Sequence, residues 1–373
     1  MSRNIGGLLP RSHETSFEVL YCSSPLGKAP EAFWLTRPES DDTMILSGAE
    51  KMPTDVIGLG ALNVDLIYET DLTSLGLEAG RERVGSFEEF RDLLGYLERK
   101  GKLRVRSGGG SAANTVYALA RMGVSSGLVG KAGQDEEGDF LLQNLREAGV
   151  DTSRVARNAR TGLCIVLLGR KRDRSILILP GANDSLSYSE IDIDYVNKAE
   201  FLHMSSFLGR IPFQMQRKVA AGTRAKISLD PGEPHATRGI KELSPLLERC
   251  FIVFASGREI ETLTGKNYKE GARELLEYGI KIIACTLGEE GSYILSRDVE
   301  LEISAVKTRV VDSTGAGDVY AAGFLAGLLK GLPLVRCARV AGRLAGLSVA
   351  GYGRSSYPDA GLLSQILEGQ DVK

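Results

Sequence analysis

The fold is decided by one stretch: Val310-Val311-Asp312-Ser313-Thr314-Gly315-Ala316-Gly317-Asp318, with the apolar residues 319–325 directly after it. The pattern predicts a short strand, a loop of small residues and a buried helix. Because glycine has no side chain, the amides of Gly315, Ala316 and Gly317 can approach an anion closely, and a helix N-terminus adds free N–H groups. The loop is therefore expected to bind phosphate, with Asp318 beside it as a proton acceptor.

A second glycine-rich segment lies about 200 residues earlier and reads Ser107-Gly108-Gly109-Gly110-Ser111-Ala112-Ala113-Asn114. Three glycines before a helix allow the backbone to lie close to a ligand, and the Asn114 amide offers both a donor and an acceptor. A glycine hinge before an ordinary helix is the alternative, and this segment alone does not decide between the two.

Together, and in this order, the two segments resemble the two signatures of the ribokinase-like (PfkB) carbohydrate kinases. The resemblance covers roughly residues 54–360. It implies a three-layer α/β/α fold with a mainly parallel central sheet and a small β lid. It also implies ATP-dependent phosphorylation of a hydroxyl on a sugar or sugar-like acceptor. In that reaction Asp318 is the general base, and the amides of Gly315, Ala316 and Gly317 form an anion hole.

For the acceptor, the informative segment is Gly58-Leu59-Gly60-Ala61-Leu62-Asn63-Val64-Asp65, after a buried strand. A dinucleotide fingerprint would need glycine where Asn63 stands, which argues against a dehydrogenase. An exposed polar pair at a strand end is the other reading of Asn63 and Asp65. The resemblance instead implies that the acceptor is bound by Asn63, Asp65, Gly109, Gly110 and Asn114, with Asp65 accepting hydrogen bonds from hydroxyls.

For the nucleotide, the resemblance implies contacts from Thr286, Gly288, Gly291, Gly315 and Gly317, with residues 351–355 near the adenine. It also implies Mg²⁺ held through water by Glu259, and a monovalent cation such as K⁺ at the Asp312 loop. One departure is Ser256, which stands where the family has the asparagine of an Asn-x-x-Glu segment. A hydroxyl makes fewer hydrogen bonds than an amide, which leaves the metal arrangement open.

Composition excludes several other classes. The 373 residues include 43% hydrophobic and 25% charged residues, with a formal net charge of −2, so no strong field favours nucleic acid or a membrane surface. No apolar run is long enough to span a bilayer. Five cysteines without a pairing motif and three scattered histidines argue against disulfides and zinc, so a cytoplasmic protein is expected.

From Asp55 onward, buried strands alternate with helices, which predicts a mainly parallel sheet covered on both faces. Residues 1–50 lack any period and are expected to be a flexible extension, unless translation starts later; residues 51–373 are the expected kinase domain. Two segments break the alternation and are expected to form the lid. Residues 66–106 include a helix near 87–99, and residues 161–179 form a hairpin with a basic turn.

The identity of the acceptor stays open at this stage. A nucleoside kinase is the nearest alternative, with Phe87, Phe90 and Tyr96 as lid aromatics. A phosphosugar kinase would use Arg104, Arg106 or the basic turn to bind phosphate. A non-catalytic sugar- or nucleotide-sensing relative is more remote, because Asp318 and the glycines are present. A homodimer through the lid is compatible with the sequence; no nucleic-acid or membrane partner is expected.

Overall fold

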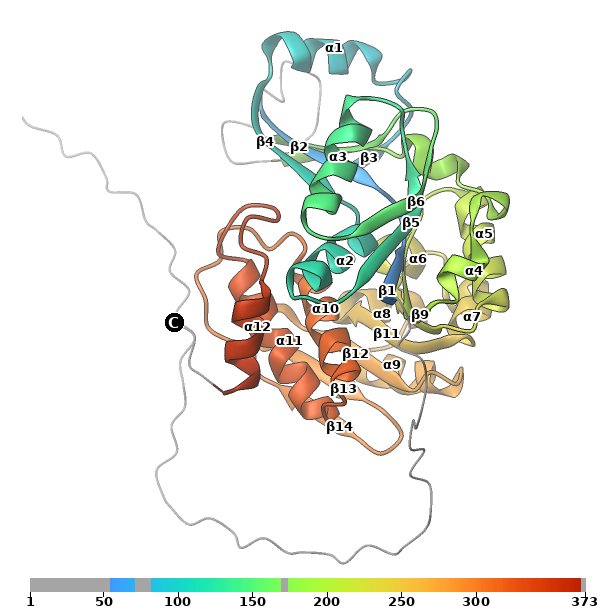
Figure 1. Cartoon of the computed structure of the whole chain (residues 1–373), viewed down its shortest axis with the longest axis vertical. Coiled ribbons are helices and arrows are strands. Elements are labelled where there is room, and N and C mark those ends of the chain that lie inside the picture. Colours follow the sequence, from blue (N-terminus) through green and yellow to red (C-terminus); the bar gives the residue numbers. More distant parts are fainter. Residues whose placement is uncertain (1–53, 71–81, 169–173, 370–373) are drawn as a thin grey trace, which may run out of the picture. The chain divides into compact units, whose positions relative to one another are not determined.

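The structure, a computed structural model, describes residues 54–70, 82–168 and 174–369. The expected extension at 1–50 and the basic turn at 169–173 therefore lie outside the described residues. The described part contains a large sheet between two layers of helices, and a smaller sheet at one end (Figure 1). Within this part, no helix is both long enough and apolar enough to cross a membrane.

The large sheet has nine strands in the order β14-β13-β12-β11-β10-β9-β1-β5-β6. The neighbouring pairs are parallel except at one edge, where β13 and β14 run antiparallel. This confirms the predicted mainly parallel sheet. Its strands are β1 (Thr54–Leu59), β5 (Ser126–Ala132), β6 (Asp151–Arg157), β9 (Ala199–Ser205), β10 (Lys226–Asp230), β11 (Cys250–Ser256), β12 (Ile282–Thr286), β13 (Ser292–Leu295) and β14 (Glu300–Ile303).

Side chains alternate between the two faces of each strand, so each face has its own core. Val56 belongs to one hydrophobic cluster and Ile57 to the other. The first cluster contains residues of α2 (Ser111–Arg121), α3 (Glu136–Glu147), α10 (Ala316–Leu329), α11 (Leu334–Ser348) and α12 (Ala360–Leu367). The second contains residues of α4 (Ile193–Val196), α5 (Arg210–Gly222), α6 (Gly232–Ala236), α7 (Ile240–Leu247), α8 (Gly257–Thr264) and α9 (Tyr268–Glu277).

Helix α10 carries the predicted catalytic aspartate and is buried along most of its length. Its small residues allow it to pack closely against α11: a methyl group on Gly323 would lie 2.9 Å from the Cα atom of Ala341. A helix that is apolar all round has to be enclosed by other elements. Enclosure from Asp318 to Gly327 fixes α10 in place relative to the sheet.

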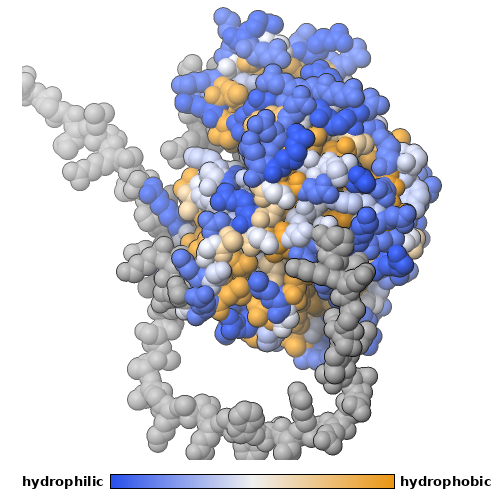
Figure 2. Space-filling model, in the orientation of Figure 1, coloured by the Kyte–Doolittle hydropathy of each residue, from blue (hydrophilic) through white to orange (hydrophobic). Residues whose placement is uncertain are grey.

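The smaller sheet, called the lid here together with α1 (Arg91–Lys100), has the strand order β3-β8-β7-β2-β4. The predicted hairpin is confirmed as β7 and β8, and the helix expected near 87–99 is confirmed as α1. Hydrophilic residues cover the α1 region on the face seen in Figure 2. The strands are β2 (Asn63–Glu69), β3 (Glu82–Val84), β4 (Lys102–Gly109), β7 (Gly162–Leu168) and β8 (Arg174–Leu179).

The lid places two predicted site segments side by side. Asn63 pairs with Gly109 in the β2–β4 ladder, so the acceptor segment and the second glycine-rich segment are neighbours. The three glycines stand directly before α2, as expected, and they divide between two elements. Gly108 and Gly109 end β4, and Gly110 alone caps α2. A methyl group on Gly110, at φ 96°, would lie 2.0 Å from the carbonyl oxygen of Ala61.

Candidate active site

The predicted phosphate loop leads directly into α10. Its N-cap Gly315 has a φ of 77°, in the left-handed region that favours glycine, and a methyl group there would lie 2.0 Å from the Tyr357 hydroxyl. The amides of Gly315, Gly317 and Asp318 donate to no backbone carbonyl in the described part of the chain, whereas the Ala316 amide donates to Ser313 at 3.2 Å. Two of the three expected anion-hole amides are therefore available to a phosphate, and the Asp318 amide adds a third.

Asp318 lies in the first turn of α10 and is 8% exposed. Its Oδ2 accepts a hydrogen bond of 2.7 Å from the side-chain amide of Asn114, on the facing helix α2. Burial raises the pKa of its carboxyl to about 6, and the neighbouring Ser111 and Asn114 side chains oppose that rise. At neutral pH Asp318 is thus ionised yet more basic than an ordinary aspartate, as a general base requires.

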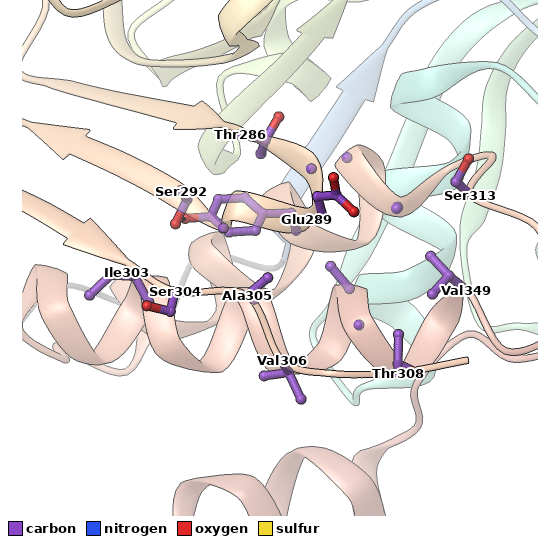
Figure 3. Close-up of a pocket in the computed structure, with 18 of the residues that line it drawn as sticks. Thr286, Glu289, Ser292, Ile303, Ser304, Ala305, Val306, Thr308, Ser313 and Val349 are labelled. Atoms are coloured by element: carbon purple, nitrogen blue, oxygen red, sulfur yellow. Dashed lines mark hydrogen bonds between the residues drawn. The ribbon is translucent and has the colours of Figure 1, made fainter. Parts of the chain in front are cut away.

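A cavity of about 400 Å³ lies on one side of this loop (Figure 3). Figure 3 shows Thr286 and Glu289 facing Ser313 and Val349 across it, with residues 303–306 along its edge. Among the residues expected to bind ATP, Gly315 alone is not part of the lining. Small residues of α11 leave room for a flat ring. The lining includes Thr286, Gly288, Gly291, Ser292, Ala305, Val310, Ser313, Ala316, Gly317, Gly342, Ala345, Gly346 and Val349.

Asp312 links the phosphate loop to the segment after α11. One carboxylate oxygen accepts from the Thr314 amide at 3.0 Å, and the other from the Gly353 amide at 3.1 Å. The amides of Val311 and Asp312 both donate to the carbonyl of Val349. The carboxylate therefore holds together the two segments expected to surround a monovalent cation.

Ser256 and Glu259 form a capping box at the start of α8. The Ser256 hydroxyl accepts from the Glu259 amide at 3.2 Å, and a Glu259 carboxylate oxygen accepts from the Ser256 amide at 2.7 Å. Ser256 also lines the nucleotide cavity. The serine therefore caps the helix and fixes Glu259 at its start, although its side chain is shorter than asparagine.

A second cavity, of about 170 Å³, lies on the lid side of Asp318. The predicted acceptor residues Asn63 and Gly110 line it. Asn183 fixes the orientation of the Asn63 side chain, because the Nδ2 atom of Asn183 donates a hydrogen bond of 3.0 Å to the Oδ1 atom of Asn63. The full lining is Ala61, Asn63, Gly110, Ser111, Ile178, Pro180, Asn183, Asp184, Ser205, Ser206, Phe207, Leu208 and Pro234.

Asp65 is on the same face of β2 as Asn63, two residues further along the strand. A methyl group on Gly109 would lie 2.3 Å from the carboxylate of Asp65, so a residue larger than glycine would displace that carboxylate. Burial raises the pKa of Asp65 to about 7, and the negative charges of Asp318 and Asp312 contribute, while the Arg354 guanidinium opposes them. The structure thus brings Asp65, Gly109 and Asp318 into one neighbourhood.

Two residues of this neighbourhood were missed from the sequence. Asp230 ends β10, and its Oδ2 accepts from the Ser111 hydroxyl at 2.7 Å. Burial and the charges of Glu259 and Asp318 raise its pKa to about 7. Its position directly after a buried strand, before Pro231-Gly232, was the available signal, because ligands bind outside the carboxyl ends of parallel strands.

Arg354 is the second missed residue. It was expected near the adenine, but its side chain lies beside α2 and is only 6% exposed. Its Nε donates to the Asn114 oxygen at 2.9 Å, its Nη1 donates to Asn144 at 3.0 Å, and the guanidinium lies 4.6 Å from the Tyr117 ring centre. Since Asn114 in turn donates to Asp318, a buried cation supports the predicted base through one intermediate residue.

The lid residues considered for nucleosides or phosphosugars point elsewhere. Phe90 is buried in the core with α1, and Phe87 stacks with Arg160 at 4.0 Å. Arg104 pairs with Glu69, and Arg106 pairs with Glu136 and Glu137. None of these residues, nor Tyr96, lines the acceptor cavity.

A nine-stranded α/β/α domain, a lid and an aspartate after a glycine loop define a ribokinase-like fold. The chain belongs to the pfkB family carbohydrate kinases, whose profile matches residues 84–372. It is therefore a carbohydrate kinase, a phosphotransferase.

Similar proteins act on different acceptors. An uncharacterized sugar kinase of Archaeoglobus fulgidus is 37% identical over 239 residues, which cover 63% of this chain and 95% of that protein. A nucleoside kinase of Methanothermobacter thermautotrophicus is 30% identical, over 68% of this chain and 82% of that protein. Among solved structures, adenosine kinase from Sinorhizobium meliloti is 26% identical, with a TM-score of 0.73 over 85% of this chain and 99% of that one.

Proposed function

We propose that the chain transfers the γ-phosphoryl group of ATP to a hydroxyl of a sugar or nucleoside, with Asp318 as the general base. One observation carries this proposal: Asp318 lines neither cavity itself but adjoins residues that line each of them. Gly317, the residue before it, lines the nucleotide cavity, and Ser111, which lines the acceptor cavity, lowers the pKa of Asp318. A hydroxyl that takes the place of Ser111 would donate its proton to this carboxylate.

The remaining residues position the reactants. Asp65 and Asn63 accept hydrogen bonds from the other acceptor hydroxyls, and Gly109 and Gly110 allow the acceptor close to the backbone. The amides of Gly315 and Gly317 stabilise the charge on the transferred group, and each such donor contributes on the order of a hundredfold to the rate. Closure of the lid would exclude water, which competes with the acceptor hydroxyl.

Cations would act from the nucleotide side. In the described part of the chain, no group of three or more His, Cys, Asp or Glu side chains could hold a metal. Mg²⁺ would therefore bind mainly to the nucleotide, with Glu259 reaching it through water, and would neutralise phosphate charge. A monovalent cation would bind carbonyl groups where Asp312 joins the two loops.

The test is acceptor-dependent ATP consumption by the purified protein over a panel of pentoses, hexoses, nucleosides and phosphosugars. For the best acceptor, Asp318→Asn is expected to lower kcat by about 10²- to 10⁴-fold, because general-base catalysis contributes that much. ATP affinity, measured by calorimetry, is expected to stay within a few-fold. The matched control is Asp298→Asn, the same change on an exposed loop.

Two results would count against the proposal. If the wild-type protein shows acceptor-dependent ATP consumption with none of the compounds in the panel, it lacks the proposed activity. Comparable kcat values for Asp318→Asn and Asp298→Asn would remove Asp318 from the role of base while leaving the kinase activity in place.

A further inference from the structure

We propose that the acceptor carries no phosphate or carboxylate group and is a polyhydroxyl compound such as a free sugar or a nucleoside. This inference rests on the proposed function and narrows its acceptor. Its first support is the lining of the acceptor cavity, in which no described residue is Lys, Arg or His. Proteins bind phosphates and carboxylates with Arg or Lys, or with helix N-termini. The wall includes one helix start, Gly110 and Ser111 of α2, where the Ala112 amide already donates to the Ser205 hydroxyl at 3.1 Å.

Carboxylates gather around this cavity instead. Asp184 is part of its wall. Asp230 is bonded to the wall residue Ser111, and Asp65 follows the wall residue Asn63 on the same strand face. Asp318 completes the set beside Ser111. Above about pH 7, where these carboxyl groups are ionised, an anionic group on the acceptor would face like charges at low solvent exposure, where repulsion is weakly screened.

Three basic residues of neighbouring segments are engaged with protein groups. Arg238 donates to the Leu208 carbonyl at 2.9 Å and pairs with Glu242, and Lys131 pairs with Glu190 at 2.7 Å. Arg354 has one nitrogen, Nη2, without a partner within the described residues. That guanidinium lies behind Gly108, between Asn114 and Asn144, and is not part of the cavity wall.

The basic turn that a phosphosugar would need is flanked by Leu168 and Arg174, which pair at the far end of the β7–β8 hairpin. The cavity end of the same hairpin is Leu163 paired with Leu179, next to the wall residue Ile178. Five residues of strand separate the two ends, which is about 17 Å. An acceptor that reaches Asp318 is therefore well separated from the residues that flank this turn.

Asp184 favours hydroxyl groups in the cavity. Its side chain adjoins Gly209; burial raises the pKa of its carboxyl, and a hydrogen bond from the Gly209 amide opposes that rise. A carboxylate gains a charge-assisted hydrogen bond when a hydroxyl enters, and a phosphate or carboxylate oxygen of the acceptor cannot donate one. Asn63, Asn183 and Ser206 add neutral donors and acceptors around it.

The decisive experiment compares acceptors in pairs that share a skeleton and keep the primary hydroxyl. Suitable pairs are ribose with ribose 1-phosphate, fructose with fructose 6-phosphate, and adenosine with adenosine 3′-phosphate. For every pair that reacts, the neutral member is expected to have a kcat/KM at least about 100-fold higher. An anionic member that reacts as well as its neutral partner overturns the inference.

That failure is distinct from failure of the proposed function. If an anionic acceptor is phosphorylated and the reaction is lost in Asp318→Asn, the kinase proposal stands and the inference alone is wrong. If no member of any pair is phosphorylated, the proposed function fails and the inference fails with it.

A variant of Asp184 tests whether this residue distinguishes neutral from anionic acceptors. Asp184→Asn keeps the shape of the side chain but removes its charge, so the KM for the neutral acceptor is expected to rise about 10-fold and the neutral-to-anionic ratio to fall. Asp194→Asn, the same change at an exposed position of α4, is the control. If the variant has the wild-type Tm and an unchanged neutral-to-anionic ratio of kcat/KM, Asp184 does not contribute to the choice of acceptor.

Discussion

The two cavities near Asp318 are lined by different kinds of chemical groups. The nucleotide cavity is lined mainly by small residues and backbone from segments near residues 286–292, 303–317 and 342–349. The wall of the acceptor cavity contains one carboxylate and two amide side chains, those of Asp184, Asn63 and Asn183, beside apolar residues, and its residue Ser111 is bonded to Asp230 of β10. We expect backbone shape to decide binding on the nucleotide side, and the charge of individual side chains to decide it on the acceptor side. Substitutions on the two sides should therefore fail in different ways.

The largest effect is expected on the backbone side. Gly315→Ala places a methyl group at a φ of 77° and 2.0 Å from the Tyr357 hydroxyl, so the loop has to shift away from the phosphate. We expect kcat to fall about 100-fold or more, with weaker ATP binding.

Gly331→Ala is the matched control for backbone strain. Gly331 has a φ of 68° and open space around the added methyl group, so the strain is similar but lies outside the site. Equal loss of activity in the two variants would show that strain, and not the phosphate loop, is responsible. Steady-state kinetics and a Tm measurement for both proteins decide the matter.

A smaller and more selective effect is expected on the acceptor side. Asp65→Ala removes a carboxylate that accepts from acceptor hydroxyls, and hydrogen bonds to charged groups contribute about 1.5–3 kcal/mol. The acceptor KM is expected to rise about 10- to 100-fold while the KM for ATP changes little. A rise in both constants would contradict the division between the two cavities.

The same division explains what could be predicted from the sequence. The phosphate loop and the turn at Thr286, Gly288 and Gly291 are contiguous segments, so local pattern reveals them. Asp184, Asp230 and Arg354 are single residues on separate elements, and the tertiary fold alone brings them together. For the fold, the long buried strands and helices were predictable. The short strands β6, β13 and β14, the last helix α12 and the extension of β4 through Gly109 were not, because pairing with neighbouring strands or packing decides them.

A substitution of Arg354 changes the charge on the acceptor side without changing a residue that is expected to contact the acceptor. Its positive charge lowers the pKa of Asp318, which burial raises to about 6. The base must be ionised, so kcat/KM is expected to fall as the pH drops through about 6. Arg354→Gln removes the cation, the pKa of Asp318 rises, and this acidic limb moves to higher pH. Arg354→Lys keeps the charge, so its limb should move less.

Rate profiles between pH 5 and 9 for wild type and both variants make this measurement. A merely structural role of Arg354 would lower the amplitude of kcat/KM without moving the limb. An acidic limb at the same pH in all three folded proteins would contradict the link from Arg354 through Asn114 to Asp318.

The smallest effect is expected on stability, at Asp230. Its pKa is about 7 in the folded chain and about 3.9 in an unfolded chain, so the folded state binds the proton more tightly. The stability that this proton contributes is present below about pH 4 and is lost as the pH rises through 7. Asp230→Asn avoids that loss, but its single amide oxygen replaces only one of the two carboxylate oxygens that accept from the Ser111 hydroxyl and the Gly232 amide. The Tm of the variant relative to wild type should therefore be higher by a few degrees at pH 8 than at pH 4. A relative Tm that is no higher at pH 8 than at pH 4 would mean that contacts of the ionised carboxylate stabilise the fold, and that acceptor-side charge carries no cost in stability.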